Sequence, residues 1–172
     1  MDRAPTEIYL LPGEHAAGRA HCRIRTLLGS CVSITLWQPR LRVGAMSHFL
    51  LPGEGKRAGL ELNGRYGQDA LALMLMDLKV LGAGTEDCEA KLFGGGAMFT
   101  SEGPLGSVGW RNGEAARQML AARGIRVVSE SLYEAGHREI IFHVGSGEVW
   151  VRHARLPEAG PAGATRPGRS SG

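Results

Sequence analysis

Several predicted strands follow one another with only a short turn between them, and this spacing limits the fold more than any other feature. Residues 21–28 and 32–37 are apolar, β-branched segments separated by three residues, and residues 43–51 follow after a turn that contains Pro39. Turns of this length join antiparallel strands, whereas parallel neighbours need a crossover of a dozen or more residues. The pattern therefore excludes an all-parallel sheet.

The rest of the chain alternates helices with further strands. Leucines at helical spacing predict a helix over residues 68–81 that ends at Gly82, and a second helix is predicted over residues 113–123, with Asn112 as its N-cap and Gly124 as its terminator. Further strands are predicted over 89–93, 126–130, 139–144 and 148–153, the last two forming a hairpin. Together these elements predict a mixed α+β domain.

One domain is expected over residues 1–156. The remaining residues, 157–172, consist mainly of Pro, Gly, Ala, Ser and scattered arginines, and we expect this tail to be disordered.

The basic character of the chain comes from its C-terminal end. The sequence has 20 Lys and Arg against 17 Asp and Glu, a formal net charge of +3. Residues 1–151 hold 16 of each sign, so the whole excess lies in residues 152–172. A neutral body with 6% aromatic residues argues against RNA binding, the function that a basic chain first suggests.

The apolar runs are too short to span a bilayer, and the N-terminal residues lack the apolar segment of a signal peptide. We therefore expect a cytoplasmic protein without membrane insertion. Its cysteines, Cys22, Cys31 and Cys88, are expected to be free thiols. No spacing typical of metal ligands occurs, so neither a metal nor another cofactor is expected.

Cys31 and His48 are the candidate reactive residues. Cys31 follows Gly29 and Ser30 in a turn where glycine permits a tight or positive-φ backbone and leaves amide groups free to face a ligand. If residues 31–37 and 43–48 pair as a hairpin closed around residues 38–41, Cys31 lies directly opposite His48, with Cβ atoms about 4.5–5.5 Å apart. That register predicts a thiolate–imidazolium pair with a lowered cysteine pKa. Considered alone, each of these two residues is more typical of a buried structural position than of a catalytic one.

The sequence defines an orienting group for the histidine less clearly. No Asp or Glu lies between Arg19 and Leu51, which leaves hydroxyl side chains as candidates, namely Thr26, Ser30, Ser33, Thr35 and Ser47. In an extended strand Thr26 and its neighbour Arg25 point to opposite faces.

Six segments, in chain order, resemble the motifs of the CheD family of chemoreceptor glutamine deamidases. They are residues 26–33, 44–52, 65–67, 90–99, 108–112 and 147–152, and they extend over most of the predicted domain. The resemblance implies an α+β fold, a single-domain sandwich of mixed and antiparallel sheets with flanking helices, similar to deamidating bacterial toxins.

The resemblance also implies an activity and a site. A cysteine amidohydrolase of this family converts glutamine side chains of methyl-accepting chemotaxis receptors to glutamate and releases ammonia. The matching positions are Cys31 as nucleophile, His48 as base and Thr26 as the third member, and the turn with Gly29 and Ser30 would stabilise the oxyanion. The residues expected at the substrate groove are Gly94, Gly95, Phe99 and Asn112, the last either there or simply capping its helix.

The partners implied are the cytoplasmic domains of chemoreceptors and a CheC-type phosphatase, with no nucleic acid. The alternative function is a non-catalytic chemotaxis adaptor that binds receptors or such a phosphatase. An adaptor needs neither Cys31 nor His48, so their presence together favours the enzyme. The glycines at 94–96 lack the Gly-Lys-Ser/Thr of a phosphate-binding loop, which argues against nucleotide binding.

Overall fold

The computed structural model describes residues 3–55, 61–98 and 106–154. Phe99 and the predicted tail at 157–172 lie outside these described residues. Within them the chain forms nine strands and two helices, in the order β1 (Thr6–Tyr9), β2 (His15–Gly18), β3 (Cys22–Leu28), β4 (Val32–Gln38), β5 (Val43–Ser47), α1 (Gly67–Val80), β6 (Glu89–Gly94), α2 (Val108–Ala122), β7 (Arg126–Leu132), β8 (His137–His143) and β9 (Val149–Ala154).

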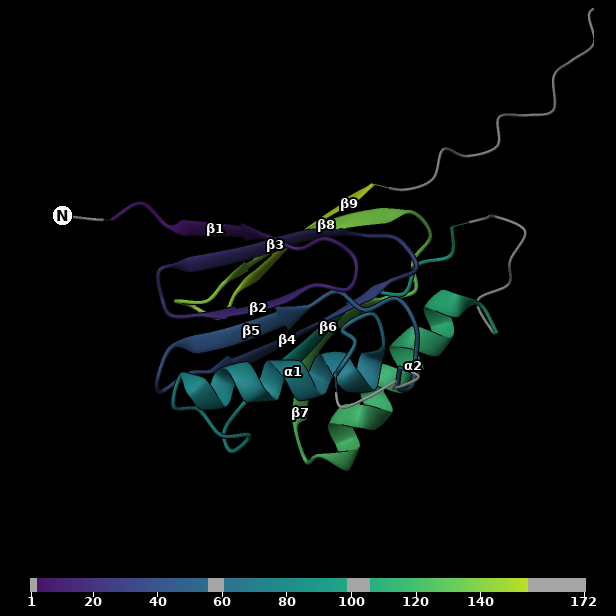
Figure 1. Ribbon diagram of the computed structural model, residues 1–172. Coiled ribbons are helices and arrows are strands. Elements are labelled where there is room, and N and C mark those ends of the chain that lie inside the picture. The colour runs from purple at the N-terminus through teal and green to yellow at the C-terminus, as the bar shows by residue number, and fades with distance from the viewer. Residues whose placement is uncertain (1–2, 56–60, 99–105, 155–172) are drawn as a thin grey trace, which may run out of the picture.

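The strands form two stacked sheets. A four-stranded sheet has the order β1-β3-β8-β9, and a five-stranded sheet has the order β2-β5-β4-β6-β7. The pairs β1–β3 and β6–β7 are parallel and the other pairs are antiparallel, so both sheets are mixed. Helices α1 and α2 both pack on the five-stranded sheet, on the face turned away from the four-stranded sheet (Figure 1). The predicted α+β class with mixed sheets and flanking helices is confirmed.

Strand β4 is buried along almost its whole length because both of its faces are covered. Val32, Ile34 and Leu36 join the apolar cluster between the five-stranded sheet and the helices. A second cluster fills the space between the sheets, and includes Ile24, Leu28, Met46, Phe93 and Phe142. Full burial of such a side chain contributes about 1.5–3 kcal/mol, so these two layers fix the order of sheet, sheet and helices.

Both helices end at the glycines predicted from the sequence. Gly82 and Gly124 follow the C-cap residues of α1 and α2 and have φ of +87° and +67°. The predicted start of α2 was wrong, because the helix begins at Val108 and the side chain of Ser107 accepts a hydrogen bond from the N–H of Trp110. Asn112 is therefore not an N-cap, and it lies buried inside the helix.

The β4–β5 hairpin forms, but its register differs by two residues from the predicted one. Thr35 pairs with Met46, and Gln38 pairs with Val43 around a turn of residues 39–42. The Gln38 side chain sets this turn, because its Oε1 accepts hydrogen bonds from the backbone of residues 40 and 41, at 2.7 and 3.1 Å. Strand β5 ends at Ser47, and the pairing resumes only as a single bridge between Val32 and Phe49.

Cys31 consequently does not lie directly opposite His48. A shift by two residues nevertheless keeps each side chain on its original face of the sheet, because side chains alternate with a period of two. The two residues still share the face that looks toward the four-stranded sheet.

The short link between β3 and β4 does not make a hairpin. Strand β3 belongs to the four-stranded sheet and β4 to the five-stranded sheet, so residues 29–31 carry the chain from one sheet to the other. The hairpin predicted near the C-terminal end does form, as β8 and β9. Within the described ranges neither helix is long and apolar enough to cross a membrane.

Candidate active site

Cys31 lies at the point where the chain crosses between the two sheets. It is half-buried and packs at the edge of the inter-sheet apolar cluster. The residues after β6 pass beside this turn, and two backbone hydrogen bonds join the segments. Gly95 N–H donates to the Cys31 carbonyl and Gly96 N–H donates to the Gly29 carbonyl, both at 2.9 Å.

This close contact explains why glycines occupy both segments. A Cβ on Gly94, whose φ is +103°, would lie 2.2 Å from the Cys31 carbonyl oxygen. Gly29 is not among the glycines with positive φ, so of the two conformations expected there the positive-φ one does not occur. A Cβ on Gly29 would instead lie 2.7 Å from the Met98 sulfur, so close packing is what requires glycine.

Thr26 and His48 meet between the sheets. Alternation along β3 turns the Thr26 side chain inward, where it is fully buried, and leaves Arg25 on the outer face in an ion pair with Glu139. His48 follows the end of β5 on the other sheet and is 2% exposed. Thr26 Oγ1 and His48 Nδ1 are 2.7 Å apart, so one hydrogen bond links the two sheets.

The hydrogen bonds of Thr26 determine the tautomer of His48. The threonine hydroxyl donates to the Leu10 carbonyl at 2.7 Å, and a carbonyl can only accept. A hydroxyl has one proton, so the proton in the Thr26–His48 bond belongs to Nδ1. Nε2 therefore carries the lone pair of the neutral ring, and in the described part of the chain this buried atom has no hydrogen-bond partner.

Burial keeps both candidate reactive groups neutral. It raises the pKa of the Cys31 thiol above its ordinary value. It also lowers the pKa of His48 to about 4, although the Glu14 carboxylate acts in the opposite direction. The predicted thiolate–imidazolium pair with a lowered cysteine pKa was therefore wrong for the resting protein. Near neutral pH the site holds a thiol and a neutral imidazole.

Asn112 ties helix α2 to this turn. Its side chain is fully buried, and Nδ2 donates to the carbonyls of Ser30 and Leu50, at 3.2 and 2.8 Å. These bonds fix the backbone just before Cys31 and just after His48. The sequence carried one signal for this role, since asparagine is a poor helix former and seldom lies inside a helix without a specific partner.

Most of the predicted site residues thus lie in one connected cluster, formed by Thr26, Gly29, Ser30, Cys31, His48, Gly94, Gly95 and Asn112. Phe99 is beyond the described residues. Sequence reasoning missed two nearby residues, Tyr133 and Arg138. Tyr133 follows β7 and its N–H donates to the Gly94 carbonyl at 3.0 Å, and Arg138 on β8 pairs with Leu28, the last residue before the turn. Across the ranges that the structure describes, no group of three or more His, Cys, Asp or Glu is placed to hold a metal ion.

The fold and this cluster define an α+β sandwich protein with a cysteine, a histidine and a threonine at the crossover of its two sheets. The chain belongs to the CheD family. The family model described as "CheD chemotactic sensory transduction" matches residues 50–153.

Named relatives extend the match to most of the chain. It is 51% identical to "Probable chemoreceptor glutamine deamidase CheD 2" of Albidiferax ferrireducens over 158 residues, which cover 90% of this chain and 91% of that protein. It is 43% identical to "Probable chemoreceptor glutamine deamidase CheD 3" of Dechloromonas aromatica, and the match covers 88% of this chain and 91% of that protein. It is 40% identical to "Probable chemoreceptor glutamine deamidase CheD" of Pseudomonas fluorescens, and the match covers 86% of this chain and 85% of that protein.

Proposed function

We propose that this chain is a protein-glutamine deamidase that hydrolyses glutamine side chains of chemoreceptors to glutamate, with Cys31 as its nucleophile. The names of the relatives supply the substrate class. The observation that carries the chemical part is the Thr26–His48 hydrogen bond, which leaves Nε2 as a proton acceptor on the face of the sheet that Cys31 shares. Nucleophilic catalysis requires a thiol and an oriented base on the same side of a site, and Cys31 and His48 share one face of the sheet.

The first step is attack of the Cys31 sulfur on the Cδ atom of the glutamine side chain. A C–S bond forms, the carbonyl electrons move to oxygen, and His48 Nε2 accepts the thiol proton. The backbone N–H groups of Ser30 and Cys31 donate to no other residue in the described part of the chain, so both can stabilise the oxyanion. Because both groups start neutral, charge develops only as the attack proceeds.

The second step releases ammonia. The His48 imidazolium donates its proton to the leaving nitrogen, the C–N bond breaks, and a thioester with Cys31 remains. Burial lowers the pKa of His48, so its imidazolium is more acidic than an ordinary one, which favours this proton transfer. Water then attacks the thioester carbon while His48 accepts one of its protons. The C–S bond breaks, His48 returns the proton to the departing sulfur, and the products are the glutamate side chain and the regenerated Cys31 thiol.

We also propose that the protein acts in the cytoplasm, where the cytoplasmic domains of chemoreceptors are accessible. A CheC-type phosphatase partner remains a prediction from the family resemblance. The described surface offers no observation that favours a purely non-catalytic adaptor.

The test is incubation of the purified chain with a purified chemoreceptor cytoplasmic domain. We expect ammonia release together with the mass change of glutamine-to-glutamate conversion. Cys31→Ala should lower turnover by about three orders of magnitude or more, because it removes the nucleophile. Cys88→Ala is the matched control, since that buried thiol donates to the Gly84 carbonyl and lies outside the cluster.

Wild-type turnover by a folded Cys31→Ala variant would refute the assignment of the nucleophile. An adaptor would give receptor binding without ammonia release by the wild-type chain.

A further inference from the structure

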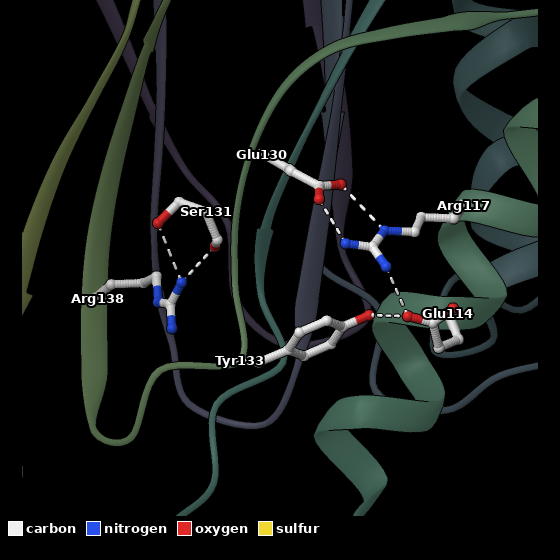
Figure 2. Close-up of polar contacts among 6 residues, drawn as sticks. All are labelled: Glu114, Arg117, Glu130, Ser131, Tyr133 and Arg138. Carbon is white, nitrogen blue, oxygen red and sulfur yellow. Dashed lines mark hydrogen bonds and ion pairs between the residues drawn. The ribbon is translucent and has the colours of Figure 1, made fainter. Parts of the chain in front are cut away.

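Arg138 on β8 is buried beside the candidate site without an acidic partner. Its side chain is 1% exposed. The Nη1 atom donates to the backbone carbonyl of Ser131 and to its hydroxyl (Figure 2). The Nη2 atom donates to the Glu134 carbonyl at 2.9 Å. Among the described residues no carboxylate forms an ion pair with this guanidinium.

Burial of an arginine side chain without an ion pair is energetically unfavourable compared with burial of an apolar side chain. A buried cation without a carboxylate loses its hydration, and an apolar side chain of similar volume stabilises a fold at least as well. The cost here is reflected in the pKa of Arg138, which burial lowers from its ordinary value although the nearby Glu134 carboxylate acts in the opposite direction. What the guanidinium does that an apolar side chain cannot do is hold two carbonyls in a fixed geometry, that of Ser131 near the end of β7 and that of Glu134 in the β7–β8 loop.

The loop that Arg138 holds, residues 133–136, contacts the glycine segment of the site. Tyr133 N–H donates to the Gly94 carbonyl at 3.0 Å, and Gly136 N–H donates to the Ala97 carbonyl at 3.3 Å. A Cβ on Gly96 would lie 2.8 Å from the Glu134 carbonyl oxygen and 3.2 Å from the Gly29 carbonyl oxygen. Gly96 is therefore packed tightly between the β7–β8 loop and the turn that carries Cys31.

The first residue of this loop is held in an unfavourable conformation. Tyr133 has a φ of +76°, which a residue with a bulky side chain seldom adopts. Its hydroxyl donates to Glu114 on α2 at 2.7 Å, and Arg117 joins Glu114 to Glu130 (Figure 2). The loop is thus fixed at one end by this network and at the other by Arg138.

We propose that Arg138 is a positioning residue for the proposed deamidation, because it fixes the β7–β8 loop against residues 94–97 and thereby fixes the backbone of Gly29–Cys31. The first link runs from the Arg138 side chain to the carbonyls of Ser131 and Glu134. The other links are bonds between backbone atoms: the loop holds Gly94 and Ala97, and Gly95 and Gly96 hold the carbonyls of Cys31 and Gly29. The statement about turnover rests on the proposed function, whereas the statement about the Cys31 backbone does not.

The experiment compares Arg138→Met, Arg138→Lys and the control Arg25→Met. Arg25 lies on the neighbouring strand β3, but its guanidinium is partly exposed on the outer face and is paired with Glu139. Three quantities are measured for the full chain: kcat and KM on a receptor cytoplasmic domain, the alkylation rate of Cys31 by iodoacetamide across a pH range, and the urea midpoint.

For Arg138→Met we expect kcat to fall about 10- to 100-fold, because a small displacement of a nucleophile is enough for a loss of this size. KM should change by less than about threefold, since Arg138 does not contact substrate. The pH profile of Cys31 alkylation should shift, because the thiol changes its position relative to His48 and the turn amides. Arg138→Lys should restore part of kcat, whereas Arg25→Met should stay within about twofold of wild type.

A purely structural arginine would lower the urea midpoint and leave kcat and Cys31 alkylation of the folded protein unchanged, and that result would overturn the proposal. If Arg138→Met does not fold, Arg138→Lys decides in the same way. If the wild-type chain itself releases no ammonia, the proposed function fails, and the alkylation profiles alone then decide whether Arg138 positions Cys31.

Discussion

Replacement of Thr26 by valine tests the central feature of the candidate site, the orientation of His48 by a hydroxyl group. Valine has nearly the shape of threonine, so the inter-sheet packing is kept while the oxygen is lost. Two hydrogen bonds disappear with it, those to His48 Nδ1 and to the Leu10 carbonyl, both 2.7 Å long.

The size of the effect follows from the burial of these groups. Each buried partner left without a hydrogen bond costs about 1–3 kcal/mol, so the loss of two bonds should lower the free energy of unfolding by about 2–6 kcal/mol. Hydrogen bonds to a charged group contribute about 1.5–3 kcal/mol, and His48 becomes charged during the reaction. At about 1.4 kcal/mol for each tenfold change in rate, kcat should fall about 10- to 100-fold. Without Thr26 the ring proton can also move to Nε2, where it blocks transfer from the thiol.

The assay is ammonia release from a receptor domain, with urea unfolding of the same samples. Thr26→Ser is the control, because it keeps the hydroxyl and removes only a methyl group, and it should retain most of kcat. KM should stay unchanged in both variants. Turnover of folded Thr26→Val within twofold of wild type would refute the reasoning. Equal losses in the valine and serine variants would assign the effect to packing instead.

Two further predictions concern residues of the same cluster. Burial lowers the pKa of His48 from its ordinary 6.5 to about 4, so between these pH values the unfolded chain binds a proton at His48 and the folded chain does not. The free energy of unfolding is therefore unaffected by this group above pH 6.5 and falls by about 3 kcal/mol as the pH decreases toward 4. His48→Asn should therefore flatten this part of the dependence of the urea midpoint on pH, and an unchanged slope would contradict a buried neutral imidazole. Asn112→Ala should lower the free energy of unfolding by about 2–6 kcal/mol and reduce kcat, because it leaves the carbonyls of Ser30 and Leu50 without their donor. A urea midpoint equal to that of wild type would show that those bonds contribute nothing.

The sequence predicted most elements of the fold because their signals are local. The C-terminal glycines of both helices and the β8–β9 hairpin are examples. It did not predict β1 and β2, which lie at sheet edges and lack an alternating apolar pattern, as in the segment His15–Gly18. It also could not assign β3 and β4 to different sheets, because a three-residue link serves a hairpin and a crossing between sheets equally well.

For the candidate site, too, the sequence predicted the local features and did not predict the long-range contacts. Cys31, His48 and Thr26 are recognisable as residue types and from the family motifs. Their geometry depends on details that no local pattern specifies, such as the Gln38 side chain that shifts the β4–β5 register. The roles of Asn112 and Arg138 depend on carbonyl partners from distant segments, so only the three-dimensional structure reveals them.

The hydrogen bond between Thr26 and His48 links residues carried by different sheets, so its length depends on the thickness of the sandwich. That thickness is set by side chains that do not contact either residue, such as Phe142, whose ring lies so close to Gly44 that a Cβ there would be 2.6 Å away. A change of volume in this interior is expected to alter the distance between Thr26 Oγ1 and His48 Nδ1 without changing either residue. We therefore expect substitutions in the inter-sheet core to affect the geometry of the candidate site as well as the stability of the fold.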